Sequence, residues 1–182
     1  MAASELTNRK SKSKGLKNQK VEDTLFSHSL LERQIVLPML NVGKNLMQTF
    51  DSYVKMNYEG KCSVEGFIKP GSINIISYSA GQNIAENIVF TVVFECQICC
   101  PVEGMKIPCI AKNITKAGIR AESKEDPSPI VVFIARDHYY EKDYFNNVKE
   151  GDNIMIKVIG QRFELNDKYI SIVAELSNKG YK

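Results

Sequence analysis

The chain has 182 residues, of which 43% are apolar, enough to bury the core of one full domain or of two small ones. No stretch approaches the roughly 18 uninterrupted apolar residues that a membrane-spanning helix needs, and the amino terminus is polar where a signal peptide would be apolar. Five cysteines, an odd number, fit a reducing compartment with free thiols better than a set of paired disulfides. We therefore expect a globular protein inside a cell or a virus particle.

Positive charge is concentrated at the amino terminus. The formal net charge is +3, but residues 1–20 hold six lysines and arginines against the single acid Glu5, a local net of +5 that leaves −2 for the rest. A nearly neutral body argues against tight, purely electrostatic binding to duplex phosphates. Any contact of the body with nucleic acid must come from a local patch or be weak.

Residues 1–23 lack apolar periodicity and are rich in Lys, Ser and Asn, which predicts a disordered basic leader. Such a leader can serve as a localisation signal or as an RNA-contacting arm. A solvated leader with neither role explains the same composition.

Residues 24–100 have the pattern of an α+β domain. Residues 25–38 are rich in apolar and β-branched side chains and end at a proline, which predicts a strand. Apolar residues from Val42 to Val54 then recur at spacings of three and four, which predicts an amphipathic helix with Asn41 as its cap.

Three β-rich runs follow the helix, over residues 61–71, 72–81 and 87–102, separated by turn-forming residues. The last run is apolar on both faces. It therefore predicts a central strand that leads into the next domain.

Residues 101–182 predict an all-β domain with five strands in about 75 residues. The strands are expected at residues 105–114, 119–123, 130–136, 153–165 and 168–176. Five short strands with regular turns suit a closed OB barrel better than a sandwich, which usually needs about seven. The expected fold is an α+β domain followed by a five-stranded S1-type OB barrel.

Several motifs carry a family resemblance. Residues 103–122, with Gly118 after the first long strand, are similar to the opening hairpin of an S1 domain, and residues 149–176 are similar to its closing hairpin. With the first domain included, residues 25–178 resemble the S1-domain stalk subunit of multisubunit DNA-directed RNA polymerase, which is the seventh subunit of eukaryotic polymerase II and has archaeal and large-DNA-virus counterparts. The motifs that carry the resemblance include Leu37-Pro38, Gly43, Glu59-Gly60-Lys61-Cys62, Gly66, Gly104, Gly118, Gly151-Asp152, Val158-Ile159-Gly160 and Asn166-Asp167.

The resemblance implies that the first domain docks on the large polymerase subunits, while the barrel lies near the nascent RNA. It also implies no catalytic residues and no cofactor, and commonly a second, smaller stalk subunit. Docking is expected at the exposed positions of one region: Gly60, Lys61, Phe67, Pro70 and Gly71. The basic leader, the loop at residues 123–129 and the cysteine-rich segment depart from the cellular pattern. These departures favour a divergent viral member, placed in a cytoplasmic virus factory or virion, over a nuclear cellular one.

OB barrels bind nucleic acid through aromatic side chains that stack on bases and cations that contact the backbone. The candidates on the expected face are Lys112, Lys116, Arg120, Phe133, Arg136, His138, Tyr139, Lys157, Arg162 and Phe163. The alternative is that the two phenylalanines are core residues and the cations only solubilise the barrel. Ile119 stands where S1 domains commonly carry an aromatic residue, so we expect weak, sequence-tolerant contact with single-stranded RNA.

Cys96 and Cys99 form a C-x-x-C motif, which raises a structural zinc site as an alternative. However, Cys96 and Cys100 would share one face of a strand and Cys99 the other, so their thiols cannot easily converge on one metal. Buried structural thiols are the favoured interpretation.

No motif predicts catalysis: His28 and His138 are far apart, and the patterns of serine hydrolases, zinc proteases and phosphate-binding loops are absent. Asp137-His138 fits a turn after a strand better than a base with its orienting acid. Two hypotheses remain, a non-catalytic polymerase stalk subunit and a free-standing S1 protein that binds RNA in translation or RNA turnover.

Overall fold

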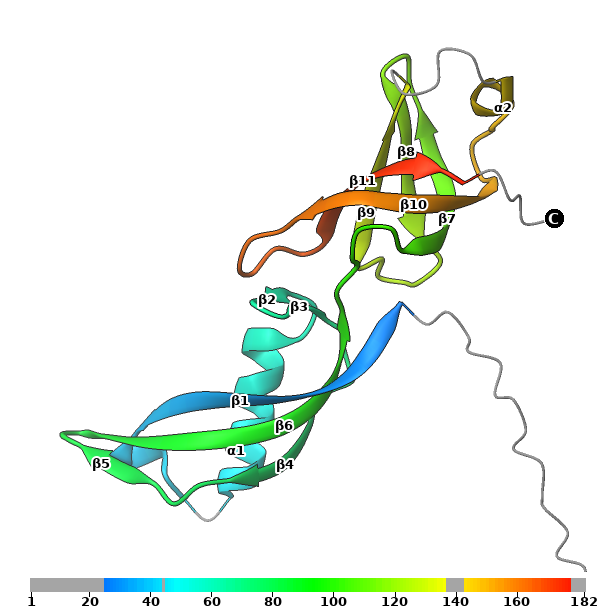
Figure 1. The fold of residues 1–182 in the computed structure, drawn as a ribbon. Helices are drawn as coiled ribbons and strands as arrows, with labels where there is room; N and C mark the ends of the chain where they lie inside the picture. The colour runs from blue at the N-terminus through cyan, green and yellow to red at the C-terminus, as the bar shows by residue number, and fades with distance from the viewer. Residues whose placement is uncertain (1–24, 44, 137–142, 178–182) are drawn as a thin grey trace, which may run out of the picture.

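The computed structural model describes residues 25–43, 45–136 and 143–177. The predicted basic leader, His138 and Tyr139 lie outside the described residues. Figure 1 shows a curved sheet with one helix and, above it, a closed barrel. No helix within the described part of the chain has the length and apolarity that crossing a membrane requires.

The first unit is built on two long strands. β1 (Phe26–Pro38) and β6 (Asn87–Cys99) are antiparallel partners along their full length. The other edge of β6 pairs with β5 (Gln82–Ile84), β4 (Asn74–Tyr78) and β3 (Gly66–Ile68), and β2 (Cys62–Ser63) pairs with β3. The predicted central strand is confirmed, because β6 pairs with four other strands.

The run at residues 61–71, expected as one strand, is instead the short hairpin β2–β3. Gly66 follows the turn of this hairpin and has a φ of +133°, a backbone conformation that residues with a Cβ rarely adopt. A Cβ there would also overlap the carbonyl oxygen of Cys99, so the absence of a side chain lets the hairpin approach β6 closely.

The helix, α1 (Leu46–Tyr58), begins later than expected. Asn41, the predicted cap, lies in the 3-10 turn η1 (Met39–Asn41), and Asn45 is the residue before the helix. A glycine such as Gly43 lowers the stability of a helix that contains it. Asparagine, in contrast, is a preferred residue type at the position before the first helical residue. The helix buries Phe50 and Val54 against the sheet, and the Phe50 ring lies 5.0 Å from the ring of Phe90.

The second unit is a closed five-stranded barrel, as predicted, and its strand order is β10-β11-β9-β8-β7. Its strands are β7 (Lys106–Ile114), β8 (Gly118–Ser123), β9 (Ile130–Ala135), β10 (Asn153–Arg162) and β11 (Ile170–Leu176), and the helix α2 (Asp143–Asn146) lies between β9 and β10 in the sequence. β9 and β11 are parallel and the other pairs antiparallel, an arrangement that fits an OB fold.

The two cores meet along β6. Cys96 and Ile98 pack in the core of the first unit, whereas Cys99 packs in the barrel core. Cys62 and Phe67 of the β2–β3 hairpin also belong to the barrel core. The hydrophobic core of the barrel therefore extends into the first unit.

Gly118 begins β8 at a point of close contact with β9. A Cβ at this position would overlap the backbone carbonyl oxygen of Ile134 and lie 3.1 Å from the Phe133 ring. Backbone atoms in a closed barrel cannot move aside cheaply. This close approach explains why a glycine stands at this motif position.

We expect Gly118→Ala to lower the free energy of unfolding by about 1–3 kcal/mol, because the added methyl group overpacks the barrel. Urea denaturation followed by circular dichroism measures the change. Gly160→Ala is the matched control, since a Cβ at Gly160 meets no atom within 4 Å. Equal stability of Gly118→Ala and the parent would contradict the packing described above.

Candidate nucleic-acid interface

One outward face of the barrel brings together three of the predicted RNA-contacting residues. One row of cross-strand neighbours begins with Arg120 of β8 and Phe133 of β9. The row continues through Val173 of β11 to Gly160 of β10. The next outward row runs through Glu122, Val131, Ser171 and Arg162. The alternation of strand residues places both rows on the outside.

The middle of this face is apolar and hollowed. Phe133 is 41% exposed and Val173 is 46% exposed. They border a shallow hollow of about 450 Å³ together with Val131, Gly160 and Arg162. An exposed phenylalanine in such a hollow offers a flat surface on which a base can stack. Phe133 is thus a surface residue and not a core residue, whereas Phe163 is partly buried against the barrel core.

Each arginine of the face is paired with a glutamate two residues further along the chain. Arg120 Nη2 lies 3.2 Å from Glu122 Oε1, and Arg162 Nη2 lies 3.1 Å from Glu164 Oε1. The cations are therefore partly neutralised, which reduces their attraction for a phosphate backbone. The face suits stacking with little electrostatic contribution.

The remaining cations lie elsewhere on the barrel. Lys112 lies at a bulge in β7 and Lys116 in the β7–β8 turn, both exposed. Arg136 lies near that turn, because its amide donates to the Ala117 carbonyl at 3.0 Å, and its guanidinium stacks on the Phe145 ring at 5.1 Å. Lys157 is paired with Glu175, with 3.0 Å between Nζ and Oε1. The predicted set thus divides among the outward face, the end of the barrel at the β7–β8 turn, and Lys157, which lies opposite Lys106 at the start of β7.

The predicted docking residues do not form one open surface. Phe67 is 1% exposed and packs in the barrel core, so its side chain is inaccessible to a partner. Lys61 is half-buried, and its ammonium group donates to the carbonyl of Met56. Pro70 and Gly71 are exposed, and docking through these two residues stays a prediction.

Sequence reasoning missed an exposed apolar cluster at the end of the sheet far from the barrel (Figure 1). Leu40 is 98% exposed, and Val36, Met39 and Ile84 are also exposed. β1 and η1 meet β5 and β6 here, since the Met39 amide donates to the Glu86 carbonyl at 3.1 Å. We call these four residues the distal cluster. Val36 lies in β1 and Ile84 in β5, whereas Met39 and Leu40 lie in η1, so no single periodicity links the four residues in the sequence.

The five cysteines do not form a metal site. Cys62, Cys96, Cys99 and Cys109 are buried and Cys100 is exposed. Within the described residues, no group of three or more His, Cys, Asp and Glu side chains is arranged to hold a metal ion. Burial raises the pKa of Cys99 and of Cys109 to about 12, so these thiols carry no charge at neutral pH.

We expect a thiol reagent such as Ellman's reagent to modify one cysteine rapidly in the native protein and all five in denaturant, because the thiolate is the reactive form. Cys100→Ser should remove the rapid phase. Release of zinc on modification would contradict the interpretation of the buried cysteines as structural thiols.

We expect Phe133→Leu to weaken the binding of a single-stranded RNA oligonucleotide by about 5- to 150-fold, since one stacked base is worth about 1–3 kcal/mol. Leucine keeps an apolar side chain over the hollow but cannot stack. Tyr53→Leu on α1 is the control, because Tyr53 is an aromatic of similar exposure, 38%, outside the barrel. Unchanged affinity in a fluorescence anisotropy titration with Phe133→Leu would exclude this face.

The fold defines a class of two-part proteins in which an OB-type barrel is joined to a sheet with one helix. No family model matches the chain. The chain is, however, 28% identical over 175 residues to a protein of Acanthamoeba polyphaga mimivirus named as a DNA-directed RNA polymerase subunit, with 85% of this chain and 83% of that protein covered.

Two plant proteins are also similar. RNA polymerase II subunit RPB7 of Glycine max is 22% identical over 163 residues, and RNA polymerase II subunit 7 of Arabidopsis thaliana is 22% identical over 156 residues. Each alignment covers 77% of this chain and 86% of the plant protein. The chain is therefore similar to RPB7 proteins at modest identity, and of these three proteins the viral one has the highest identity.

Proposed function

We propose that the chain is a non-catalytic stalk subunit of a DNA-directed RNA polymerase and that it contacts nascent RNA during transcription. The observation that carries this proposal is the extent of the similarity, which covers 83–86% of the length of proteins named as polymerase subunits. A free-standing S1 protein would share the barrel with such subunits but would not need the sheet and helix that precede it. The alternative role in translation or RNA turnover is therefore less well supported.

The two parts of the chain would have different roles. Exposed apolar clusters on a soluble protein commonly mark an interface with another protein. The distal cluster is such a surface, and its proposed partners are the large polymerase subunits. Pro70 and Gly71, from the sequence prediction, are a second candidate surface for docking. The barrel face around Phe133 is the proposed contact for single-stranded RNA.

Weak RNA binding is compatible with this role. The cations of the outward face are paired with acids at 3.1–3.2 Å, so the isolated barrel is expected to bind RNA weakly. Attachment to a polymerase raises the effective concentration of nearby RNA and removes the need for high intrinsic affinity. The similarity to a mimivirus protein supports a viral polymerase, in a virus factory or virion, over a nuclear one.

Affinity purification of the tagged chain tests the assignment. We expect the large polymerase subunits to copurify, together with a smaller stalk subunit if the complex has one. Recovery of ribosomes or RNA-degrading complexes without polymerase would contradict the proposal.

The same experiment separates the two docking surfaces. Leu40→Asp with Ile84→Asp should abolish copurification of polymerase, because each change places a charge in an apolar contact. Val102→Asp, at an exposed apolar residue outside the cluster, is the control and should have no effect. If changes at Pro70 and Gly71 abolish copurification and the double variant does not, docking occurs at the second surface.

Crosslinking to nascent RNA tests the proposed role of the barrel in the assembled enzyme. Combined replacement of Lys112, Arg120 and Arg162 by alanine should lower crosslinking while polymerase recovery is unchanged. Unchanged crosslinking would show that these cations do not contact the transcript.

A further inference from the structure

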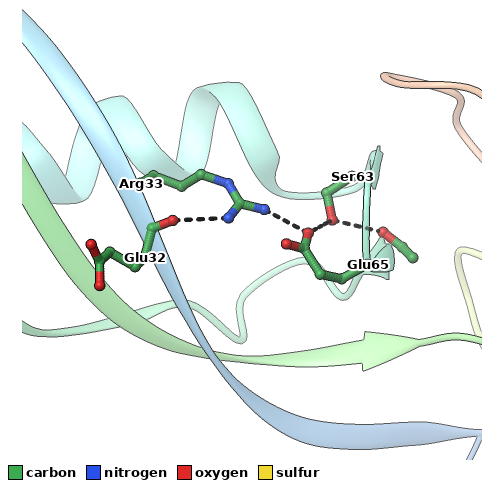
Figure 2. A network of polar contacts seen from close by, with 5 residues as sticks. Glu32, Arg33, Ser63 and Glu65 are labelled. Carbon is green, nitrogen blue, oxygen red and sulfur yellow. Dashed lines mark hydrogen bonds and ion pairs between the residues drawn. The ribbon is translucent and has the colours of Figure 1, made fainter.

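The β2–β3 hairpin pairs with β6 within the first sheet, and a polar network also links it to β1 (Figure 2). One guanidinium nitrogen of Arg33 on β1 donates to the carboxylate of Glu65, and the other donates to the Glu32 carbonyl at 2.9 Å. The Ser63 hydroxyl lies 2.9 Å from the same carboxylate and 3.1 Å from the Gly66 carbonyl oxygen. The hydrogen bond from Arg33, followed by that from Ser63, lowers the pKa of Glu65, so the carboxylate is ionised at neutral pH.

The other side of the same hairpin is bonded to the barrel. The Cys62 amide donates to the Asp167 carbonyl at 2.8 Å, and the Asn166 amide donates to the Cys62 carbonyl at 2.9 Å. Asn166 and Asp167 belong to the turn between β10 and β11, far from Cys62 in the sequence. These two reciprocal bonds join the two units in the manner of a short β-bridge.

The barrel turn is fixed by its own contacts. The Asp167 carboxylate accepts a hydrogen bond from the Glu164 amide at 2.8 Å, and the Asp167 amide donates to the Glu164 carbonyl at 3.2 Å. Asn166 has a φ of +69°, which asparagine tolerates better than most residues. The turn therefore presents its outward peptide groups to Cys62 in a defined geometry.

Few other connections set the direction of the barrel. Among the described strands, the chain crosses from sheet to barrel once, between the end of β6 at Cys99 and the start of β7 at Lys106. The start of β1, with Leu25 and Phe26, packs against the barrel core as a separate contact. Without the hairpin, one linker and this contact would have to resist rotation of the barrel.

We propose that the β2–β3 hairpin is a positioning element: Arg33, Glu65 and Ser63 hold it against the 164–167 turn, so that the barrel keeps one orientation on the first unit. This role goes beyond the proposed function and does not depend on it, because it concerns the isolated chain. In a polymerase subunit, the same coupling would fix where the barrel face points once the other end of the chain is docked.

Amide hydrogen exchange, followed residue by residue by NMR on the full chain, tests the proposal. Glu65→Gln keeps the shape of the side chain and removes its charge, and Arg33→Met removes the other partner. In both variants the Cys62 and Asn166 amides should exchange at least about tenfold faster, because the junction opens locally. Amides within the middle of β6 and β10 should keep their rates.

Two further variants supply the control and the rescue. Lys55→Met removes the same charge as Arg33→Met from an exposed ion pair with Asp51 on α1, and it should leave both junction amides unchanged. The charge exchange Arg33→Glu with Glu65→Arg should restore slow exchange at Cys62 and Asn166. Residual dipolar couplings on the same samples should fit one orientation of the two units in the parent and no single orientation in Glu65→Gln.

Two outcomes would overturn the proposal. If Cys62 and Asn166 exchange at the parental rate in Glu65→Gln and the couplings still fit one orientation, the network does not position the barrel. If exchange accelerates equally throughout the molecule, the network only stabilises the fold. Neither outcome bears on polymerase copurification, so failure of this proposal is distinguishable from failure of the proposed function.

Discussion

The architecture depends on one strand, β6, whose side chains contribute to two hydrophobic cores. Its middle part packs under α1 with Phe94 and Cys96, and its last residue, Cys99, packs in the barrel. The strand is stiff over this length because β1 pairs with it from Asn87 to Cys99, while β5, β4 and β3 pair with parts of its other edge. The strand therefore carries the chain from one unit into the other without a flexible linker inside it, and the β2–β3 hairpin adds a second connection.

This construction places the surface proposed for attachment apart from the surface proposed for RNA contact. The distal cluster lies at one end of the molecule and the barrel at the other (Figure 1). An apolar surface such as that around Leu40 can supply binding energy to a protein partner through burial. The barrel face, in contrast, combines one exposed aromatic ring with arginines that are already paired. A divided arrangement of this kind is compatible with the proposed attachment at one end and the proposed weak RNA contact at the other.

Sequence reasoning predicted the order of elements and the closed barrel, because alternation and turn residues are local signals. It also predicted β6, whose apolar residues on both faces require burial on both sides. It placed the start of the helix too early, since the apolar spacing from Val42 continues across Gly43 without a break in the pattern. It treated residues 61–71 as one strand, because the contact between Gly66 and the backbone of β6 is tertiary and leaves no local signal.

For the candidate site, the sequence identified Arg120, Phe133 and Arg162 but not the acids that pair with the two arginines. Each pair joins side chains two residues apart, and its formation depends on the rotamers that the two side chains adopt. Phe67 was expected among the exposed docking positions of residues 60–71, yet the hairpin folds it under the barrel. We propose above all that this chain is a subunit of a DNA-directed RNA polymerase. Quantitative mass spectrometry of RNA polymerase purified through its largest subunit, from the native source, tests it most directly: the account predicts this chain in near-stoichiometric amount, and its absence from active enzyme would contradict the account.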